Sequence, residues 1–196
     1  GLSAPQSSLG SGVVVDAARG LIITNNHVIQ NADQIRVTFH NDKTLPAKVL
    51  GVDEKTDLAV LKVEPKDEKL FAAPFGNSDV MRVGDWVIAI GNPFGLGGTV
   101  TAGIISARAR DIQSGPYDDY IQTDASINRG NSGGPMFNMR GEIIGINTAI
   151  YSPSGGSVGI GFAIPSALVK PVIDQIVQYG HTRRGWIGVR IQSVTD

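Results

Sequence analysis

The feature that most constrains the fold is a series of short runs rich in Val, Ile and Leu, each bounded by Gly, Asn, Asp or Pro. Apolar runs of about four to eight residues between turn formers predict strands. In the first half of the chain these runs are residues 13–15, 21–24, 34–39, 47–52, 58–63 and 86–90. In the second half they are residues 99–107, 120–123, 135–137, 143–148 and 158–164. Many short strands at this spacing predict an all-β barrel or sandwich.

One segment, residues 166–179, has the periodicity of a helix. Its apolar residues fall on one face at helical spacing, Ser166 is a suitable N-cap, and Gly180 is a suitable stop. Pro171 lies early enough to be tolerated with some local distortion. We therefore expect a single helix, packed across the barrels, at the C-terminal end of the β structure.

Composition excludes several classes of function. The chain has 196 residues, 41% hydrophobic and 18% charged, which is typical of a globular protein. A net charge of −1 indicates neither a nucleic-acid-binding surface nor a basic membrane patch. The absence of cysteine excludes disulfides and thiol catalysis. The Gly-rich segment 91–98 lacks a Lys-Ser/Thr signature and a following helix, so we interpret it as a connecting or regulatory loop rather than a phosphate cradle.

The stretch from Asn128 to Pro135 places one serine, Ser132, among three glycines. Such a backbone can bend sharply and approach a bound substrate closely. A serine hydroxyl becomes a useful nucleophile only with a base to take its proton and amides to hold the developing charge. Taken alone, the stretch also fits a simple turn, or the G-x-S-x-G pattern of α/β-hydrolases.

Candidates for the base and the orienting acid lie upstream. His27 directly follows an apolar strand, where a base could be held rigidly, whereas His40 lies in a polar turn and His181 follows the helix stop. Asp57 opens the apolar run 58–63, and a carboxylate there needs a hydrogen-bond donor such as an imidazole. Asp42 and Asp53 lie in more polar turns and are weaker candidates.

The chain order distinguishes the two hydrolase interpretations. His27, Asp57 and Ser132 follow the order His, Asp, Ser of chymotrypsin-like proteases, whereas α/β-hydrolases have the serine first. The residues after Ser132 also cannot form the helix that a nucleophile elbow requires, since a turn and a strand follow.

The chain closely resembles the HtrA/Deg (Do-like) serine proteases. The matching blocks span nearly the whole chain and are residues 10–13, 24–29, 55–62, 89–96, 122–125, 128–135 and 159–165. The resemblance implies a chymotrypsin-like pair of six-stranded antiparallel barrels, with the active site in the cleft between them and a C-terminal helix. It implies a protease domain over residues 1–182, with barrel one at about 10–92 and barrel two at about 99–165. Residues 183–196 are then a linker and the truncated start of a PDZ domain.

The resemblance also assigns roles within the site. His27 acts as general base, Asp57 orients it, and Ser132 is the nucleophile. The backbone N–H groups of Gly130 and Ser132, with Asn131 between them, form the oxyanion hole. The resemblance places three apolar residues in the substrate pocket, which favours small or branched aliphatic side chains at the cleaved bond. These residues are Ile127, Ala149 and Ile150.

Activation is expected to involve loop ordering. Chymotrypsin-like zymogens mature when a new N-terminus pairs with an aspartate before the serine, but this chain has Asn131 there. By resemblance, Phe94 in the Gly-rich loop, Arg110 in the segment 108–119, and the loop 150–156 order the oxyanion hole. The family forms homotrimers through N-terminal segments, and the arm 1–9 here lacks aromatic residues.

Two functions are therefore in competition. The first is an ATP-independent serine endopeptidase of the bacterial periplasm that degrades misfolded or unfolded proteins, without metal or cofactor and without a need for a membrane. The second is a chaperone, holdase or peptide-binding module with a resting protease site. The complete set of His27, Asp57 and Ser132 favours the protease.

Overall fold

The computed structural model describes residues 9–92, 98–110, 119–149 and 157–184. Its first half contains strands β1 to β5, a single-turn helix α1 and a 3₁₀ turn η1. These elements are β1 (Val13–Asp16), β2 (Leu21–Asn25), α1 (Asn26–Ile29), β3 (Ile35–Thr38), β4 (Thr44–Asp53), β5 (Leu58–Val63) and η1 (Ser78–Val80). The second half contains β6 (Trp86–Gly91), β7 (Thr99–Arg110), β8 (Tyr120–Thr123), β9 (Pro135–Phe137), β10 (Ile143–Thr148), β11 (Gly161–Pro165) and α2 (Ser166–Tyr179).

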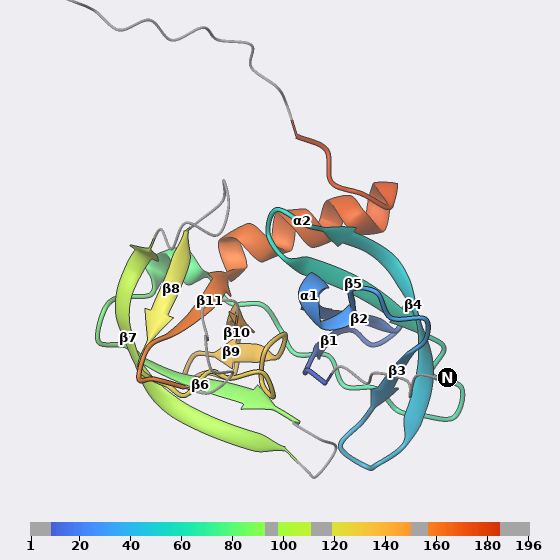
Figure 1. The fold of residues 1–196 in the computed structure, drawn as a ribbon, viewed down its shortest axis with the longest axis horizontal. Coiled ribbons are helices and arrows are strands. Elements are labelled where there is room, and N and C mark those ends of the chain that lie inside the picture. The colour runs from blue at the N-terminus through green and yellow to red at the C-terminus, as the bar shows by residue number, and fades with distance from the viewer. Residues whose placement is uncertain (1–8, 93–97, 111–118, 150–156, 185–196) are drawn as a thin grey trace, which may run out of the picture.

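The strands form two sheets that lie side by side (Figure 1). One is a closed six-stranded barrel with the order β10-β11-β8-β7-β6-β9. The other is a five-stranded sheet with the order β1-β2-β5-β4-β3, and every strand pairing in both sheets is antiparallel. The expected chymotrypsin-like architecture is confirmed, although the N-terminal sheet has five strands in the described residues rather than six.

Strand β6 belongs to a different half from the one that the sequence predicted. The run at 86–90 was expected to complete the first barrel, with the Gly-rich loop separating the halves. Instead β6 pairs with β7, from Trp86↔Ile104 to Gly91↔Thr99, and with β9. The Gly-rich loop therefore joins two adjacent strands of one barrel, and the chain passes between the halves before Trp86. Residues 93–97 themselves lie outside the described part of the chain.

A continuous apolar core joins the two halves and the helix. It contains Leu21, Ile23, Leu58 and Val60 from the N-terminal sheet, and Ile143, Ile146, Phe162 and Ile164 from the barrel. Burial of large apolar side chains is the main favourable term in folding, so this shared core fixes the halves against each other. A second core lies inside the barrel, and a third lies against β3 and β4.

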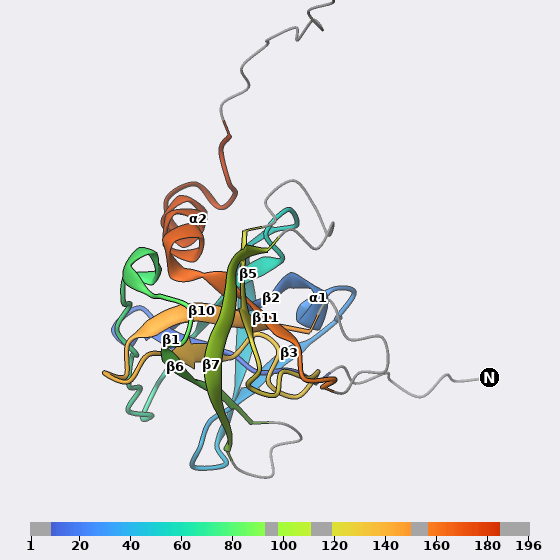
Figure 2. The same ribbon diagram turned by 90° about the vertical axis from the view of Figure 1, so that its left-hand side faces the viewer.

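Helix α2 lies across both halves at one edge of the molecule (Figures 1 and 2). It buries Val169, Val172, Ile173 and Ile176 in the shared core, and it ends as predicted at Gly180 in a left-handed conformation. Gly51 on β4 permits this packing, since a Cβ there would lie 2.7 Å from Ile176 Cγ2. Within the described residues, α2 is too short and no other helix has the length and hydropathy to cross a bilayer.

Ser166 does not cap its own helix, contrary to the sequence prediction. The cap position is Pro165, and Ser166 Oγ instead accepts from Ser78 N–H at 3.1 Å and donates to the Gly76 carbonyl at 2.9 Å. In turn, Ser78 Oγ accepts a hydrogen bond from the Ala167 backbone N–H at 2.9 Å. The helix N-terminus is thus satisfied by the segment that connects the halves, an arrangement that local sequence cannot reveal.

Candidate active site

The pairing of β2 with β5 brings His27 and Asp57 together. These strands are antiparallel neighbours with Asn25 opposite Leu58, so the end of one lies beside the start of the other. His27 follows β2 by two residues, on the single turn α1, and Asp57 immediately precedes β5. The Asn26 amide donates to the Asp57 carbonyl at 2.9 Å, which ties α1 to the turn that carries the acid.

The two side chains are in direct contact. His27 Nδ1 lies 2.5 Å from Asp57 Oδ2, and the His27 backbone N–H donates to the other carboxylate oxygen at 2.9 Å. Asp57 is buried and has a φ of 57°, in the left-handed region that aspartate tolerates better than most residues. Both oxygens of Asp57 are therefore engaged by His27, which fixes the orientation of the imidazole and leaves Nε2 for the nucleophile.

Ser132 reaches this pair from the loop between β8 and β9. Its Oγ lies 3.3 Å from His27 Nε2, and the side chain is fully buried. Gly133 permits the close approach because it has a φ of 88°. A Cβ there would lie 2.5 Å from Thr24 Oγ1 and 3.1 Å from Asn25 N, both in β2. The glycine after the serine thus lies closely against β2, the strand that leads into α1 and His27.

The predicted oxyanion donors are engaged by Asn128. Gly130 N–H donates to Asn128 Oδ1 at 2.8 Å, and Ser132 N–H donates to the Asn128 carbonyl oxygen at 3.0 Å. The backbone N–H of Asn131 also donates to Asn128 Oδ1, at 3.3 Å. An oxyanion hole needs N–H groups directed at a substrate atom. The loop in this conformation satisfies its own donors instead.

Asn131 completes this internal arrangement. Its Oδ1 accepts from Asn128 N–H at 3.0 Å, its Nδ2 donates to the Ser126 carbonyl at 2.9 Å, and only 2% of the residue is exposed. Asn131, at the position of the zymogen aspartate, therefore forms hydrogen bonds within its own loop.

Ser11 and Asn25 contact the serine loop and were not predicted from the sequence. The Ser11 amide donates to the Ser132 carbonyl at 2.9 Å, and its hydroxyl donates to the Gly130 carbonyl at 2.6 Å. Asn92 N–H donates to the same hydroxyl at 2.9 Å. Ser11 is thus part of the candidate site. Asn25 is a buried polar residue that ends an apolar strand, which is the signal that could have singled it out.

The predicted pocket and regulatory residues are only partly described. Ile127 is buried, and a Cβ on Gly161 would lie 2.5 Å from Ile127 Cγ1. Ala149 is half-buried, and its N–H donates to Ser132 Oγ at 2.9 Å. Arg110 lies on β7 with its backbone paired to Tyr120. Ile150 and Phe94 lie outside the described residues.

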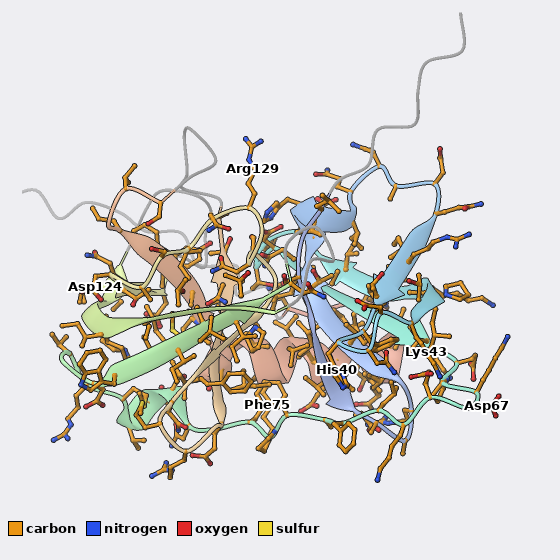
Figure 3. The ribbon with its side chains drawn as sticks, turned by 90° about the horizontal axis from the view of Figure 1, so that it is seen from below. His40, Lys43, Asp67, Phe75, Asp124 and Arg129 are labelled. Atoms are coloured by element: carbon orange, nitrogen blue, oxygen red, sulfur yellow. The ribbon has the colours of Figure 1, made fainter. Side chains whose placement is uncertain are left out.

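The other two histidines, His40 and His181, lie on the surface. His181 Nδ1 lies 3.0 Å from the Tyr179 carbonyl beyond the end of α2. His40 is exposed in the turn between β3 and β4, whereas Arg129 projects from the serine loop (Figure 3).

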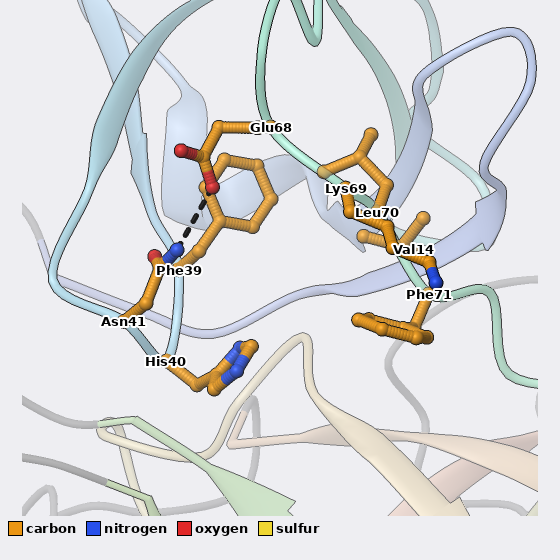
Figure 4. A pocket seen from close by; sticks show the side chains of 8 residues that line it. All are labelled: Val14, Phe39, His40, Asn41, Glu68, Lys69, Leu70 and Phe71. Atoms are coloured by element: carbon orange, nitrogen blue, oxygen red, sulfur yellow. Dashed lines mark hydrogen bonds between the residues drawn. The ribbon is translucent and has the colours of Figure 1, made fainter.

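His40 borders a small hollow of about 120 Å³ in which Asn41 donates to Glu68 at 2.8 Å (Figure 4). The hydrogen bonds from Lys43 and Asn41 lower the pKa of Glu68.

Asp53, at the end of β4, is a buried carboxylate that contacts none of His27, Asp57 and Ser132 through its side chain. Arg184 pairs with both of its oxygens, at 2.6 and 2.7 Å, and Thr182 and Thr56 also donate to it. Burial raises the pKa of Asp53, but the bonds from Arg184, Thr56 and Thr182 outweigh that effect and lower it. The chain that follows α2 is therefore fixed to the turn that carries Asp57.

Comparison with known proteins identifies the family of this chain. Residues 10–146 match the model of the trypsin-like peptidase domain. The chain belongs to the trypsin-like peptidases. Within this family its curated relatives include the probable periplasmic serine endoprotease DegP-like of Brucella suis, 58% identical over 186 residues. That match covers 95% of this chain and 36% of the relative.

Other members of the family agree with the HtrA/Deg resemblance. The probable periplasmic serine protease do/HhoA-like of Haemophilus influenzae is 52% identical over 184 residues, covering 93% of this chain and 39% of the relative. A solved structure titled HtrA-type protease AlgW with decapeptide is 50% identical with a TM-score of 0.85, covering 95% of this chain and 57% of the other. The chain thus spans little more than a third of the curated relatives that it matches.

Chemically, the arrangement brings together an imidazole, a carboxylate in contact with one of its nitrogens and a hydroxyl close to the other. This is the minimum set for nucleophilic attack by serine on an acyl group. Acyl transfer also needs N–H donors directed at the substrate oxygen, and in this conformation the N–H groups of Gly130 and Ser132 donate to Asn128 instead.

Proposed function

We propose that this chain is the catalytic domain of an ATP-independent serine endopeptidase that cleaves unfolded or misfolded proteins. The observation that carries the proposal is the contact of His27 with Asp57 at 2.5 Å on one side and with Ser132 Oγ at 3.3 Å on the other. The names of the relatives support protein substrates and a periplasmic location.

In the proposed reaction, Ser132 Oγ attacks the carbonyl carbon of the scissile peptide while His27 Nε2 takes its proton. Asp57 holds the imidazole in the correct tautomer and stabilises the imidazolium. The C–N bond then breaks, and His27 donates the proton to the leaving amine. Water repeats the sequence on the acyl-enzyme, which releases the acid product and restores the Ser132 hydroxyl. Each step needs only groups of this chain, peptide and water.

The proposal includes a gate at the oxyanion loop. Stabilising the tetrahedral intermediate requires Gly130 and Ser132 N–H to leave Asn128 and face the substrate oxygen. Losing one such donor typically costs about 3 kcal/mol of transition-state stabilisation, so the resting loop has a low rate. Ordering of the loop is a population shift between two arrangements of the same residues. Control by the segments that contain Phe94, Arg110 and Ile150 remains a prediction from the resemblance, as does assembly into a homotrimer.

Substrate preference follows from the residues placed by resemblance at the pocket. Ile127 and Ala149 are apolar, and neither supplies the acid that a basic side chain would require. We therefore propose small or branched aliphatic residues at the cleaved bond. Discrimination is expected to be weak, since one methylene is worth about 1–3 kcal/mol in such a pocket.

The decisive experiment is reaction with a fluorophosphonate probe, which modifies only an activated serine, together with casein cleavage. The wild-type chain should be labelled and should cleave casein, and a Ser132→Ala variant should do neither. The matched control is Ser157→Ala, which changes an exposed serine and should behave as wild type. Equal turnover by wild type and Ser132→Ala would exclude Ser132 as the nucleophile.

A further inference from the structure

Asn25 contacts the reacting hydroxyl but belongs to none of the roles assigned so far. It is the last residue of β2 and is completely buried. Its Oδ1 accepts a hydrogen bond from Ser132 Oγ at 2.8 Å, and its Nδ2 donates to the Asp57 carbonyl at 3.1 Å. One amide therefore connects the nucleophile to the turn that carries the acid.

The Ser132 hydroxyl has only one hydrogen to donate, and two acceptors compete for it. Asn25 Oδ1 lies at 2.8 Å, whereas His27 Nε2 lies at 3.3 Å, beyond the usual range of such a bond. Ala149 N–H, at 2.9 Å, already donates to the same oxygen. The shorter contact thus assigns the hydroxyl hydrogen to Asn25 in this conformation.

An amide oxygen accepts a hydrogen bond but does not take up a proton at neutral pH, so a hydroxyl bonded to it is not activated. We propose that Asn25 is a positioning residue that holds the Ser132 hydroxyl in a resting orientation. Attack then requires the hydroxyl to turn from Asn25 Oδ1 to His27 Nε2, after which the proton passes to Nε2 as the bond to the carbonyl carbon forms. This inference rests on the proposed function, since it takes Ser132 as the nucleophile.

The surroundings of Asn25 allow a clean test. The Asp57 carbonyl also accepts from Asn26 N–H at 2.9 Å, so it keeps a partner if Asn25 Nδ2 is removed. Ser132 Oγ likewise keeps Ala149 N–H as a donor and can turn to His27 as its acceptor. Leucine is close to asparagine in shape, so Asn25→Leu removes the competing acceptor and leaves neither of these two groups without a partner.

The experiment compares the rate constant of fluorophosphonate labelling in wild type, Asn25→Leu and Asn25→Ala. Removing a competing hydrogen bond of ordinary strength should raise the rate about two- to tenfold in both variants. Asn25→Ala should also unfold at a lower temperature, because it leaves a cavity. The control is Asn138→Ala, a buried asparagine whose partners are Arg140 and Glu142 in the β9–β10 turn. It should lower the melting temperature without changing the labelling rate.

Folded Asn25→Leu that is labelled more slowly than wild type, or at the same rate, would overturn the inference, since a purely structural role predicts no gain. A second measurement does not depend on the variants folding. Neutron diffraction from the deuterium-exchanged wild-type chain should place the Ser132 hydroxyl deuteron toward Asn25 Oδ1, and a deuteron directed at His27 Nε2 would contradict the inference. Absence of labelling in the wild type as well would instead count against the proposed function.

Discussion

The two sides of the candidate active site are prepared to different degrees. On the N-terminal side, His27 already rests on Asp57, and α1 is tied to the acid turn by a main-chain bond. On the C-terminal side, Ser132 donates to Asn25 and the oxyanion amides are engaged by Asn128. If the proposed roles hold, the fold already holds the base against its carboxylate, whereas the serine hydroxyl and the loop amides would have to exchange hydrogen-bond partners before attack.

The largest loss of turnover is expected on the N-terminal side, where His27 contacts Asp57. Asp57→Asn keeps an acceptor for the His27 amide but favours the wrong tautomer of the imidazole. Turnover of a peptide substrate should fall about 10⁴-fold. Asp67→Asn, which changes an exposed carboxylate, is the control and should leave turnover unchanged. A loss of less than about tenfold in Asp57→Asn would mean that Asp57 does not orient the base.

The contact between the sides should be the next most sensitive position. Gly133→Ala places a Cβ against β2 at a positive φ, so we expect about 3 kcal/mol less stability and about 10²-fold lower turnover. Thermal unfolding and peptide kinetics measure the two effects. Gly141→Ala is the matched control, because Gly141 has a φ of 74° but open space around it. It should cost some stability without altering turnover, and equal behaviour of the two variants would disprove the close approach.

The turn between β4 and β5, which carries Asp57, can be destabilised through Asp53. Arg184→Ala leaves this buried carboxylate without its cation and should cost about 3 kcal/mol at neutral pH. Arg140→Ala, which breaks an exposed pair, should cost less than about 1 kcal/mol.

The pH dependence of this effect has a defined sign. Because the pKa of Asp53 is lowered in the folded protein, the stabilisation is present above its unfolded value of about 3.9 and is lost as pH falls through the lower folded value. The difference in stability between wild type and Arg184→Ala should therefore narrow below about pH 4. Denaturant unfolding between neutral and acidic pH measures it, and a constant difference would contradict the assignment.

The smallest effect is expected in the serine loop of the C-terminal side, where a substitution should raise kcat/KM. Asn128→Ala removes the acceptor that engages the Gly130 and Asn131 amides. The resting loop should lose population, and kcat/KM for a peptide should rise about fivefold, as for one net hydrogen bond. A fall in kcat/KM with an unchanged melting temperature would show that Asn128 supports the active loop instead.

Sequence reasoning succeeded where the signal was local. Alternation of apolar runs and turn residues located the strands to within a few residues, and Gly180 marked the end of α2. The order of His27, Asp57 and Ser132 in the chain predicted that their side chains meet, and His27 lies 2.5 Å from Asp57 and 3.3 Å from Ser132 in the structure. Strand β6 was placed in the wrong half because a glycine-rich hairpin and a linker between halves have the same composition.

The missed residues have tertiary partners that leave no local pattern. Ser11 reaches Gly130 across 119 positions, and Asn25 reaches Ser132 across 107. Ser166 has the residue type of an N-cap but bonds to Ser78 and Gly76 instead. Short polar side chains beside buried strands are common, so only the fold distinguishes the ones that hold a functional loop.

The shared apolar core has a consequence for how such a molecule can be switched. A two-lobed enzyme whose lobes move apart needs a small or polar interface between them, yet here β2 and β5 pack against β10, β11 and α2 through one continuous apolar core. Separating the lobes would expose that interior, which is a cost on the scale of unfolding itself. An activator or an inhibitor must therefore act on the rim of the molecule, a few residues at a time.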